Sequence, residues 1–464
     1  MRWGYEPRTA GLGPPGKAIN EHPACCVVKD FVIGGTRTGV GKTTITLALL
    51  KGLSDAGYAV QSFKVGPGFV DAQRHESLTG RPCYNLDAFL MGEAGVKREL
   101  AKAQADVVII EGASGIYTGS SSTARIAEMV GAPIILTVDA SASSESVAAT
   151  VLGFVQYAAH TPYDVRVVGA IATRVGSDKH IGDIRKALER IGIPLVGVLR
   201  RDVWERSRHP GQPCGREPAV TDPSLVAICE DLDVPSILAS GAELVVPAAV
   251  SGCFDRADLT IGVPLDAAFC FYYRSNIEAL ERSARLEFFS PLRERLPRVD
   301  GLYIGGGFPE AHVQRLSANA ALLNDIHVKA AEGMPMIAEG GGLVYLSRSL
   351  RVNGALHTLA GVVPAEVRTT DNVQALGHSE VEIVRDCVIA GRGERLRGHE
   401  YHRSVAEPDR DARFAFNMIR GTGIGGCDGI VEYNVLASYQ HVHVYSLRHG
   451  FDAFLAAAQR YSRS

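Results

Sequence analysis

Short apolar runs alternate with helical stretches along the first half of the chain. Continuous Val and Ile runs are typical of strands buried on both faces, and helices between them indicate parallel pairing. A first run at residues 27–28 and 31–33 leads into a glycine-rich turn and a predicted helix at 44–53. Further strands are predicted at residues 59–64, 107–110, 134–138, 167–172 and 195–199, and one of the intervening helices at 181–191.

The pattern loosens around residues 213–249, and a second α/β series follows. Its predicted strands lie at 260–263, 301–304 and 334–338, with a helix at 275–285. The last two strands run into Gly305-Gly306-Gly307 and Glu339-Gly340-Gly341-Gly342. Ligand sites in parallel α/β sheets lie at the carboxyl ends of strands. We therefore predict an α/β protein with a flexible tail at 1–26, one domain at 27–250 and a second at 251–464.

Composition narrows the classes of partner. The chain has 464 residues and a formal net charge of −3, which gives no support to a nucleic-acid or anionic-membrane partner. No apolar run approaches the roughly 18 residues of a membrane span, and the tail lacks the apolar segment of a signal peptide. Nine cysteines show no repeated Cys-x-x-Cys spacing, so we expect a reduced, cytoplasmic protein.

A glycine-rich loop between the first strand and the first helix predicts a phosphate site. Glycines let backbone N–H groups face phosphate oxygens, and the helix N-terminus adds partial positive charge. Lys42 would reach the β- and γ-phosphates of a nucleotide, and the Thr43 hydroxyl would bind Mg²⁺. The strict motif has glycine six places before the lysine, where this chain has Thr36. The predicted ATP-binding residues are Thr36, Gly39, Val40, Gly41, Lys42, Thr43 and Thr44.

Motifs spread over nearly the whole chain from about Val28 resemble the cobyrinic acid a,c-diamide synthase family. In the first half they are the loop itself, Lys64-Val65-Gly66-Pro67, Asp71 with His75, Asn85-Leu86-Asp87, Glu111-Gly112 and Ser122-Thr123-Ala124. In the second half they are residues 268–273, Phe289-Ser290-Pro291-Leu292, residues 305–310, residues 398–402 and residues 438–443.

This resemblance implies a two-part enzyme. An N-terminal P-loop domain with a parallel sheet would use ATP and Mg²⁺ to phosphorylate a carboxylate of a tetrapyrrole. A C-terminal domain like class I glutamine amidotransferases, flavodoxin-like in fold, would release ammonia from glutamine. Ammonia would then displace phosphate to give an amide, a reaction in which the protein contributes positioning and charge neutralisation. The tetrapyrrole and its reacting carboxylates stay open, as does a homodimer.

Four acidic and basic residues near the loop have a functional and a structural interpretation. Glu111 ends a buried strand, where a carboxylate needs an ion pair or a metal; we assign it to Mg²⁺. Lys64, at another strand end, is a candidate catalytic residue for the γ-phosphate or the substrate carboxylate, or a surface lysine. Asp71 and Asp87 are either functional residues or turn formers.

Several positions differ from the family pattern. Gly68 and Thr118 replace aspartates, Thr173 replaces an asparagine that reads adenine, and residues 208–211 only faintly match Pro-Glu-Arg-His-Leu-Gly. These changes affect the metal, base and substrate regions.

The largest difference is Gly340, which stands where the family has its nucleophilic cysteine. Glycine cannot form a thioester, so glutaminase activity is not expected. His441 matches the general base of that pair, yet it also fits an ordinary strand residue sharing one face with His443. Gly305-Gly306-Gly307 matches the oxyanion loop, and His399-Glu400 could face a substrate or the domain interface.

Two functions therefore compete. The first is an ATP-dependent amide ligase that acts on tetrapyrrole carboxylates with free ammonia or with ammonia from a separate glutaminase. The second is a non-catalytic nucleotide-binding paralogue acting as a regulatory, scaffold or tetrapyrrole-binding partner. The intact loop favours the first, and the changes at Gly68, Thr118, Thr173 and Gly340 favour the second.

Overall fold

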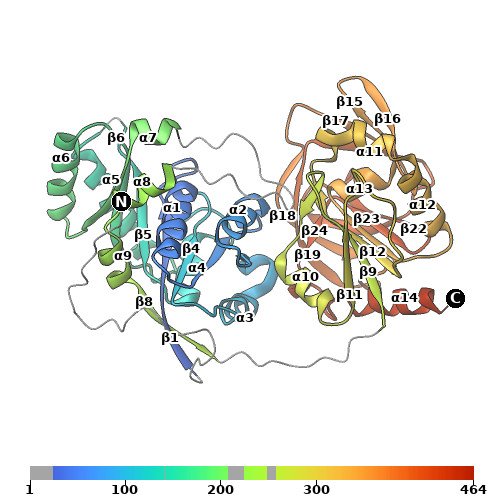
Figure 1. Ribbon diagram of the computed structural model, residues 1–464, viewed down its shortest axis with the longest axis horizontal. Helices are drawn as coiled ribbons and strands as arrows, with labels where there is room; N and C mark the ends of the chain where they lie inside the picture. The colour runs from blue at the N-terminus through green and yellow to red at the C-terminus, as the bar shows by residue number, and fades with distance from the viewer. Residues whose placement is uncertain (1–24, 142, 207–223, 248–257, 464) are drawn as a thin grey trace.

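The computed structural model describes residues 25–141, 143–206, 224–247 and 258–463. They form two α/β bodies that lie side by side (Figure 1). The predicted tail and the predicted boundary at 250–251 lie almost wholly in ranges outside these residues, as does the 208–211 segment.

The first body contains the predicted parallel sheet. Its strand order is β3 (Tyr84–Leu86), β2 (Val60–Val65), β4 (Val107–Glu111), β1 (Cys25–Gly35), β5 (Ile134–Asp139), β6 (Val167–Val175) and β7 (Leu195–Arg200). Along β1, Val28 and Val32 pack into one hydrophobic cluster, and Phe31 and Ile33 pack into another. Because both faces are covered, the strands read as unbroken apolar runs.

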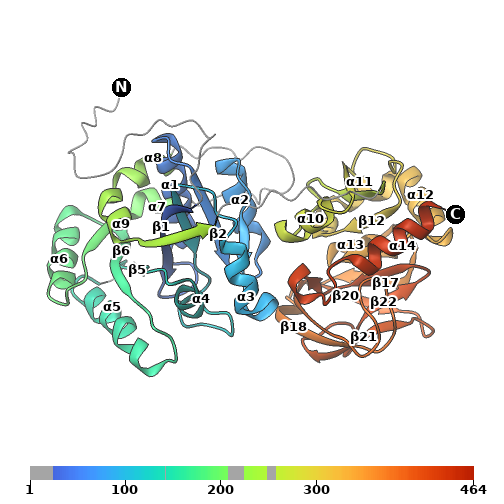
Figure 2. The same ribbon diagram turned by 90° about the horizontal axis from the view of Figure 1, so that it is seen from below.

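Helices cover both faces of this sheet (Figures 1 and 2). The helix after the glycine loop begins at Lys42, two residues earlier than predicted, because Gly41 precedes its first turn. The helices of this body before residue 207 are α1 (Lys42–Asp55), α2 (Phe69–Thr79), α3 (Ala88–Leu100), α4 (Thr123–Val130), α5 (Ser146–Tyr157), η1 (Ala158–His160), α6 (Asp178–Glu189) and α7 (Arg201–Arg206).

The segment that the sequence pattern left as irregular is folded where the structure describes it. Residues 224–247 form α8 (Ser224–Glu230), α9 (Val234–Ser240) and β8 (Ala242–Pro247). Strand β8 pairs antiparallel with the first half of β1, from Asp30 opposite Ala242 to Cys25 opposite Pro247. The sequence pattern loosens here because these short elements carry little periodicity of their own, and so no element was predicted in 224–247.

The second body is built on a mixed sheet. Its parallel part contains β11 (Arg285–Phe289), β9 (Thr260–Pro264), β12 (Gly301–Ile304), β14 (Met336–Glu339) and β23 (Val435–Ser438). An antiparallel part continues through β22 (Cys427–Glu432), β21 (Phe414–Arg420), β18 (Ala375–Ile383), β19 (Arg395–His402) and β24 (His441–Val442). The helix predicted at 275–285 ends at Glu281, and Arg285 begins β11.

Smaller elements complete this body. Strands β10 (Phe269–Phe271) and β13 (Gly306–Gly307) pair, and a four-stranded sheet contains β16 (Ala355–Thr358), β15 (Ser347–Val352), β17 (Val363–Thr369) and β20 (Ser404–Pro408). The helices are α10 (Arg274–Glu281), η2 (Pro309–His312), α11 (Val313–Ala318), α12 (Ala320–Ala331), α13 (Gly341–Leu346), η3 (Val444–Ser446) and α14 (Asp452–Ser462). None of the described helices combines the length and apolar character needed to cross a bilayer.

The two bodies meet through α2, α3 and β3 of the first and α10, β10, β18 and β19 of the second (Figures 1 and 2). An aromatic cluster lies in this contact and contains Phe69, Leu90, Cys270, Phe271 and Tyr273. At its side, the Tyr84 hydroxyl donates to Glu278 over 2.7 Å. The first residues of α2 and β3 therefore lie against the second body.

Candidate functional site

The glycine loop turns sharply into α1. Gly39 and Gly41 have φ angles of 72° and 110°, values that side chains disfavour. Lys42, the first residue of α1, is buried, and its Nζ atom donates to the carbonyls of Arg37 (3.1 Å) and Ser114 (2.6 Å). The Thr36 amide donates to Thr137 over 3.1 Å, and Val40 and Thr44 are buried. All seven predicted loop residues lie around one turn at the end of β1.

Glu111 connects three other side chains at the end of β4. It is fully buried, and its Oε1 atom accepts from the Thr43 hydroxyl (2.6 Å) and from Lys64 Nζ (2.8 Å). Its Oε2 atom lies 2.7 Å from Nε2 of His75. Lys64 also pairs with Asp71, Nζ to Oδ2, at 3.0 Å. The structure thus brings Thr43, Glu111 and Lys64 together, and it joins Asp71 to them.

The charges of this cluster depend on each other. Burial alone would raise the pKa of Glu111, but Lys64 and His75 hold that pKa well below its usual value. Burial alone would lower the pKa of Lys64, yet Glu111 and Asp71 raise it. Burial lowers the pKa of Lys42 to about 8, and repulsion from Lys64 acts in the same direction. Glu111 and Asp71 therefore hold Lys64 in its charged form, while burial weakens the hold of Lys42 on its proton.

The donor set suits Mg²⁺ held jointly with a nucleotide. Mg²⁺ is usually bound by one or two carboxylates together with substrate phosphates, rather than by a cage of protein ligands. The Thr43 hydroxyl and the Glu111 carboxylate already lie 2.6 Å apart. Among the described residues no group of three or more His, Cys, Asp and Glu side chains could hold a metal alone. Thr43 and Glu111 would therefore hold Mg²⁺ with phosphate oxygens as further ligands.

His75 is a member of this cluster to which sequence reasoning gave no role. It lies on α2, is fully buried, and its Nδ1 atom is 3.5 Å from the Cys83 sulfur. Burial would lower the pKa of His75, but Cys83 and Glu111 raise it. The spacing of Asp71 and His75, four residues apart on a helix, was the available signal, because such residues share one helix face.

Asp87 serves as both a turn former and a contact between the bodies. Its Oδ1 atom accepts from the amides of Phe89 and Leu90, which caps the N-terminus of α3. Its Oδ2 atom lies 2.7 Å from Nε2 of His378 in the second body.

Of the substituted positions near the loop, Gly68 and Thr118 border open space, whereas Thr173 contacts the loop. A β-carbon on Gly68 would meet nothing within 4 Å, and Thr118 is exposed. Thr173 is buried at β6, and its hydroxyl donates to the Val40 carbonyl over 2.9 Å. Thr173 therefore holds the phosphate loop, and a threonine lacks the amide that would read a base.

The elbow after β14 keeps the shape of a nucleophile turn without the nucleophile. Gly340 has φ 52° and ψ −107°, and a β-carbon there would lie 2.6 Å from Nε2 of His441. His441 is buried, with Nδ1 3.5 Å from Glu339 Oε2. Glu339 in turn accepts from the Tyr303 hydroxyl and the Val442 amide, both at 3.1 Å. Side chains that would serve a nucleophile thus lie around a residue that has no side chain.

Other second-body candidates separate into different roles. β24 contains only His441 and Val442, so the predicted strand shared by His441 and His443 is too long. His443 instead caps η3, where its Nδ1 atom accepts from the Tyr445 amide over 3.3 Å. A β-carbon on Gly306 of the oxyanion-type loop would lie 2.5 Å from Cε1 of His441. The loop glycine is thus required for the close approach of His441.

His399 and Glu400 point to different neighbours. His399 is paired in register with His378 on one side and His441 on the other. Glu400 accepts from the amides of Thr422 (3.1 Å) and Gly423 (3.3 Å). His399 therefore lies on the face toward the first body, while Glu400 stabilises the loop at Thr422 and Gly423 in its own domain.

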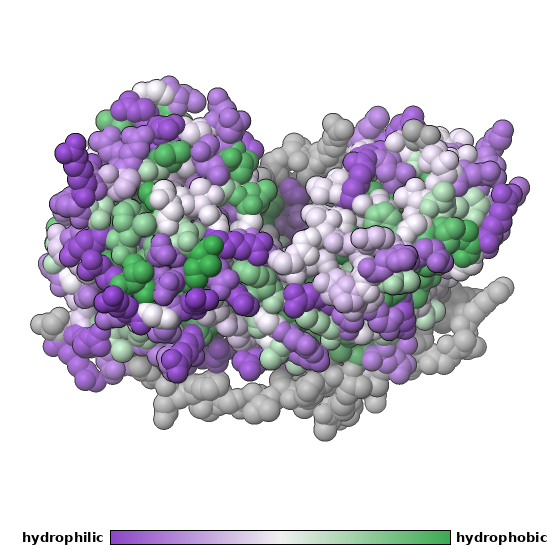
Figure 3. Space-filling view, turned by 180° about the vertical axis from the view of Figure 1, so that it is seen from behind, coloured by the Kyte–Doolittle hydropathy of each residue, from purple (hydrophilic) through white to green (hydrophobic). Residues whose placement is uncertain are grey.

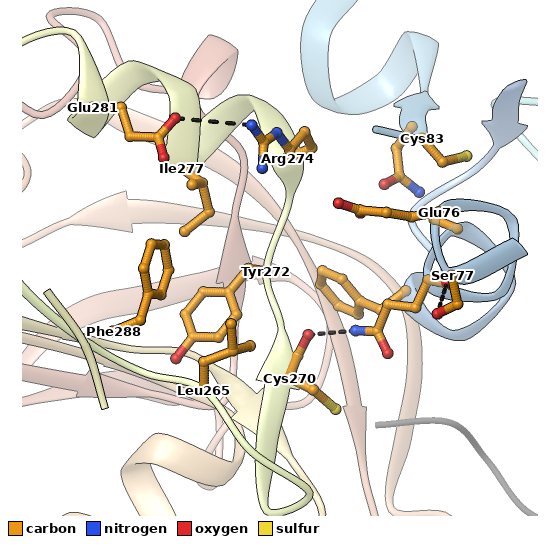
Figure 4. Close-up of a pocket in the computed structure, with 14 residues that line it drawn as sticks. Glu76, Ser77, Cys83, Leu265, Cys270, Tyr272, Arg274, Ile277, Glu281 and Phe288 are labelled. Atoms are coloured by element: carbon orange, nitrogen blue, oxygen red, sulfur yellow. Dashed lines mark hydrogen bonds and ion pairs between the residues drawn. The ribbon is translucent and has the colours of Figure 1, made fainter. Parts of the chain in front are cut away.

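A cavity of about 470 Å³ lies between α2 and the segment from β9 to α10. Figure 4 shows Glu76, Ser77 and Cys83 on one wall and Tyr272, Arg274 and Glu281 on the other. The Gln73 side-chain amide donates to the Cys270 carbonyl. Burial raises the pKa of Glu76, against the smaller opposing effect of Arg274. The Tyr272 hydroxyl accepts from the Gly305 amide over 3.0 Å, so one wall of this cavity supports the oxyanion-type loop.

Two family models match this chain. Residues 31–208 match the CobQ/CobB/MinD/ParA nucleotide binding domain. Residues 260–448 match the CobB/CobQ-like glutamine amidotransferase domain. The nucleotide-binding domain and the amidotransferase-like domain predicted from sequence are thus confirmed.

Curated relatives resemble the chain along nearly its whole length. The cobyrinate a,c-diamide synthase of Halobacterium salinarum is 42% identical over 445 residues, covering 95% of this chain and 100% of the relative. That of Haloarcula marismortui is 40% identical and covers 93% of this chain and 100% of the relative. Among solved structures, PurLQS from Thermotoga maritima has a TM-score of 0.33 at 11% identity, covering 44% of this chain and 100% of that chain.

Proposed function

This chain belongs to the cobyrinate a,c-diamide synthase family, and we propose that it amidates side-chain carboxylates of a tetrapyrrole at the expense of ATP. The observation that carries the proposal is the linkage of the phosphate loop to a buried carboxylate. One carboxylate oxygen of Glu111 in β4 accepts hydrogen bonds from Thr43 of the loop and from Lys64 of β2, each within 2.8 Å. A nucleotide, a metal and an anionic substrate would meet there.

In the proposed first step, a substrate carboxylate oxygen attacks the γ-phosphorus of ATP and the bond to the β-phosphate oxygen breaks. This gives an acyl phosphate and ADP. Lys42 and the backbone amides of the loop neutralise the phosphates, and Mg²⁺ would neutralise the charge that develops on them. Lys64, whose ammonium group pairs with Glu111 and Asp71 at the end of β2, is assigned to the incoming carboxylate.

In the second step, the lone pair of ammonia attacks the acyl carbon and phosphate leaves with the bonding electrons. The attacking nitrogen then loses a proton to give the amide. Ammonia must reach this centre from solution or from a separate glutaminase, because Gly340 has no side chain that could attack glutamine. The retained Glu339, Tyr303 and His441 contacts hold the elbow but provide no nucleophile.

The test is ATP turnover with cobyrinate and related carboxylated tetrapyrroles, with either ammonium or glutamine as nitrogen source. We expect ADP and the amide to form in equal amounts with ammonium, and no product with glutamine. Lys42→Met is the control, because it removes the phosphate-binding charge and leaves the elbow intact.

The runner-up is a non-catalytic nucleotide-binding paralogue that acts as a regulatory, scaffold or tetrapyrrole-binding partner. The observation that favours it is Thr173, which bonds to the loop at the position where an asparagine would read adenine. Binding of ATP with no turnover on any of the substrates would establish this second function and exclude the first. Glutamine hydrolysis by the purified chain above a buffer control would contradict our interpretation of Gly340.

A further inference from the structure

A serine, a histidine and an aspartate lie in a row across the contact between the two bodies. The Ser120 hydroxyl oxygen is 3.2 Å from Nδ1 of His378, and Nε2 of the same ring is 2.7 Å from Oδ2 of Asp87. Ser120 and Asp87 belong to the first body, whereas His378 lies in β18 of the second, 258 and 291 positions away. The docked bodies therefore assemble a group of three side chains that neither body has alone.

The hydrogen bonds of His378 assign the position of its proton. A carboxylate oxygen only accepts, so Nε2 of His378 donates to Asp87, and the neutral ring then has its acceptor at Nδ1. The Ser120 hydroxyl lies at that acceptor and can pass its proton to it. This is the arrangement of a serine–histidine–aspartate triad with the two ring nitrogens exchanged. The exchange does not prevent proton transfer, because the charged imidazole carries a proton on both nitrogens.

Asp87 and His378 are fixed in place, while Ser120 is open to solvent. Asp87 is fully buried, and its Oδ1 atom accepts from two amides at the start of α3. The ring of His378 stacks on Phe89, with centroids 4.6 Å apart. Ser120 is exposed, and Figure 3 shows that a notch separates the two bodies beside their contact. A nucleophile needs a base of fixed orientation and an oxygen that a substrate can reach, and both are present here.

Donors for an oxyanion lie beside Ser120. The backbone amides of Ser120 and Ser121 donate to no acceptor within the described ranges, and α4, whose N-terminus carries partial positive charge, begins at Thr123. In serine hydrolases the amide of the nucleophile or of the next residue stabilises the oxyanion. The loop is held in place, because Arg125 donates to the Ser120 carbonyl (2.8 Å) and the Ser121 hydroxyl accepts from the Ala88 amide (2.7 Å).

We propose that this triad hydrolyses carboxylic esters, with Ser120 as nucleophile, His378 as general base and Asp87 as the residue that positions the base. The Ser120 oxygen attacks the carbonyl carbon of the ester while its proton passes to Nδ1 of His378. The bond to the alcohol oxygen breaks, and the alcohol leaves with the bonding electrons and that proton. Water then attacks the acyl-serine through the same base, which releases the acid and restores Ser120. Neither ATP nor ammonia takes part, so this activity goes beyond the proposed function and does not rest on it.

The first experiment measures covalent labelling of the full chain by an alkyl fluorophosphonate, which reacts with activated serines. Peptide mass spectrometry should locate a single adduct, on Ser120. His378→Phe keeps a ring against Phe89 but removes the base, and Asp87→Asn keeps an oxygen for the cap of α3 but removes the carboxylate. Each variant should lower the labelling rate at least about 100-fold, because general-base catalysis contributes that much or more.

The second experiment measures hydrolysis of p-nitrophenyl acetate without ATP. The wild type should release p-nitrophenol in a burst that matches the chain concentration, followed by a slower steady rate, because the acyl-serine forms first. Ser120→Ala should show no burst. Ser146→Ala is the matched control, because Ser146 is another exposed serine of the first body, and it should leave burst and labelling unchanged. Urea unfolding of each variant checks that it is folded under the assay conditions.

Three outcomes would overturn the inference. The first is a wild type that the fluorophosphonate does not label, or labels at another residue. The second is equal labelling of the wild type and a folded His378→Phe variant, which would show that Ser120 reacts without the histidine. The third is an unchanged burst in Ser120→Ala, which would assign ester cleavage to other side chains. None of these measurements involves amidation, so the proposed function is tested separately.

Discussion

The Nε2 atom of His441 lies 2.6 Å from the point where a β-carbon on Gly340 would lie. The ring therefore occupies space that any larger residue at 340 would need. Because Gly340 also has φ 52° with ψ −107°, a side chain there meets both backbone strain and a close neighbour. The elbow in this structure therefore fits glycine better than any larger residue.

We predict that Gly340→Cys and Gly340→Ala each lower the free energy of unfolding by about 1–3 kcal/mol, because both add the same strained β-carbon. Only the cysteine variant supplies a thiol beside His441, so only it should gain glutamine hydrolysis. Urea unfolding and a coupled glutamate assay measure the two effects. Equal hydrolysis by the alanine and cysteine variants would show that the thiol does not act as the nucleophile.

Glu111→Gln should destabilise the fold and abolish ATP turnover. The substitution leaves the buried Lys64 without its nearest counter-charge, and breaking a buried pair in this way costs about 3–5 kcal/mol. Turnover should fall at least about 100-fold, because a metal-binding oxygen is lost. The measurements are urea unfolding and ADP release with ammonium and cobyrinate.

Asp71→Asn is the matched control for Glu111→Gln. Asp71 is the second partner of Lys64, but its side chain is 29% exposed, against 0% for Glu111. Its loss should cost about 1 kcal/mol or less. Equal destabilisation by both variants would contradict the central role assigned to Glu111.

Asp30 should make the stability of the first body depend on pH. It is buried in β1, neither carboxylate oxygen has a hydrogen-bond partner among the described residues, and burial raises its pKa from 3.8 to about 6. The folded state then binds a proton more tightly than the unfolded state. Stability is fully present below pH 4 and is lost as the pH rises through 6.

The expected loss between pH 4 and pH 7 is about 2–3 kcal/mol, at 1.36 kcal/mol for each unit of pKa. The Asp30→Asn variant should not show this loss of stability with rising pH, and it should be more stable than the wild type at pH 7. Urea unfolding of both proteins at several pH values measures the difference. If the free energy of unfolding depends on pH in the same way in both proteins, groups other than Asp30 cause that dependence.

The Asp87–His378 contact should couple the two bodies. A double-mutant cycle with Asp87→Ala and His378→Phe is suitable, because phenylalanine keeps a ring against Phe89. We expect a coupling energy of about 0.5–3 kcal/mol, typical of residues in direct contact. Asp87→Ala alone should cost an additional ~1 kcal/mol, since it also removes the cap of α3. A coupling energy near zero would mean that the contact does not contribute to docking.

Local signals made much of the first body predictable. Glu111 and Lys64 could be placed together because unbroken apolar runs ending in a charged residue mark the carboxyl ends of parallel strands. The second body was harder, because its antiparallel run from β22 to β24 pairs segments distant in sequence. The partner of Asp87 is 291 positions away, and no local pattern indicates such a pair. The four-residue spacing of Asp71 and His75 placed both on one face of α2, but it did not indicate that His75 contacts Glu111 of β4.

Phe69 is where the two bodies depend on each other most directly. Its ring stacks on Phe271 and lies 5.1 Å from the ring of His441, while α2, which it begins, carries Asp71 and His75. A shortened chain ending before the second body would leave Phe69 and Leu90 facing water, a hazard for aggregation. Loss of the nucleophile therefore does not make the second body dispensable, and selection can retain it for solubility alone.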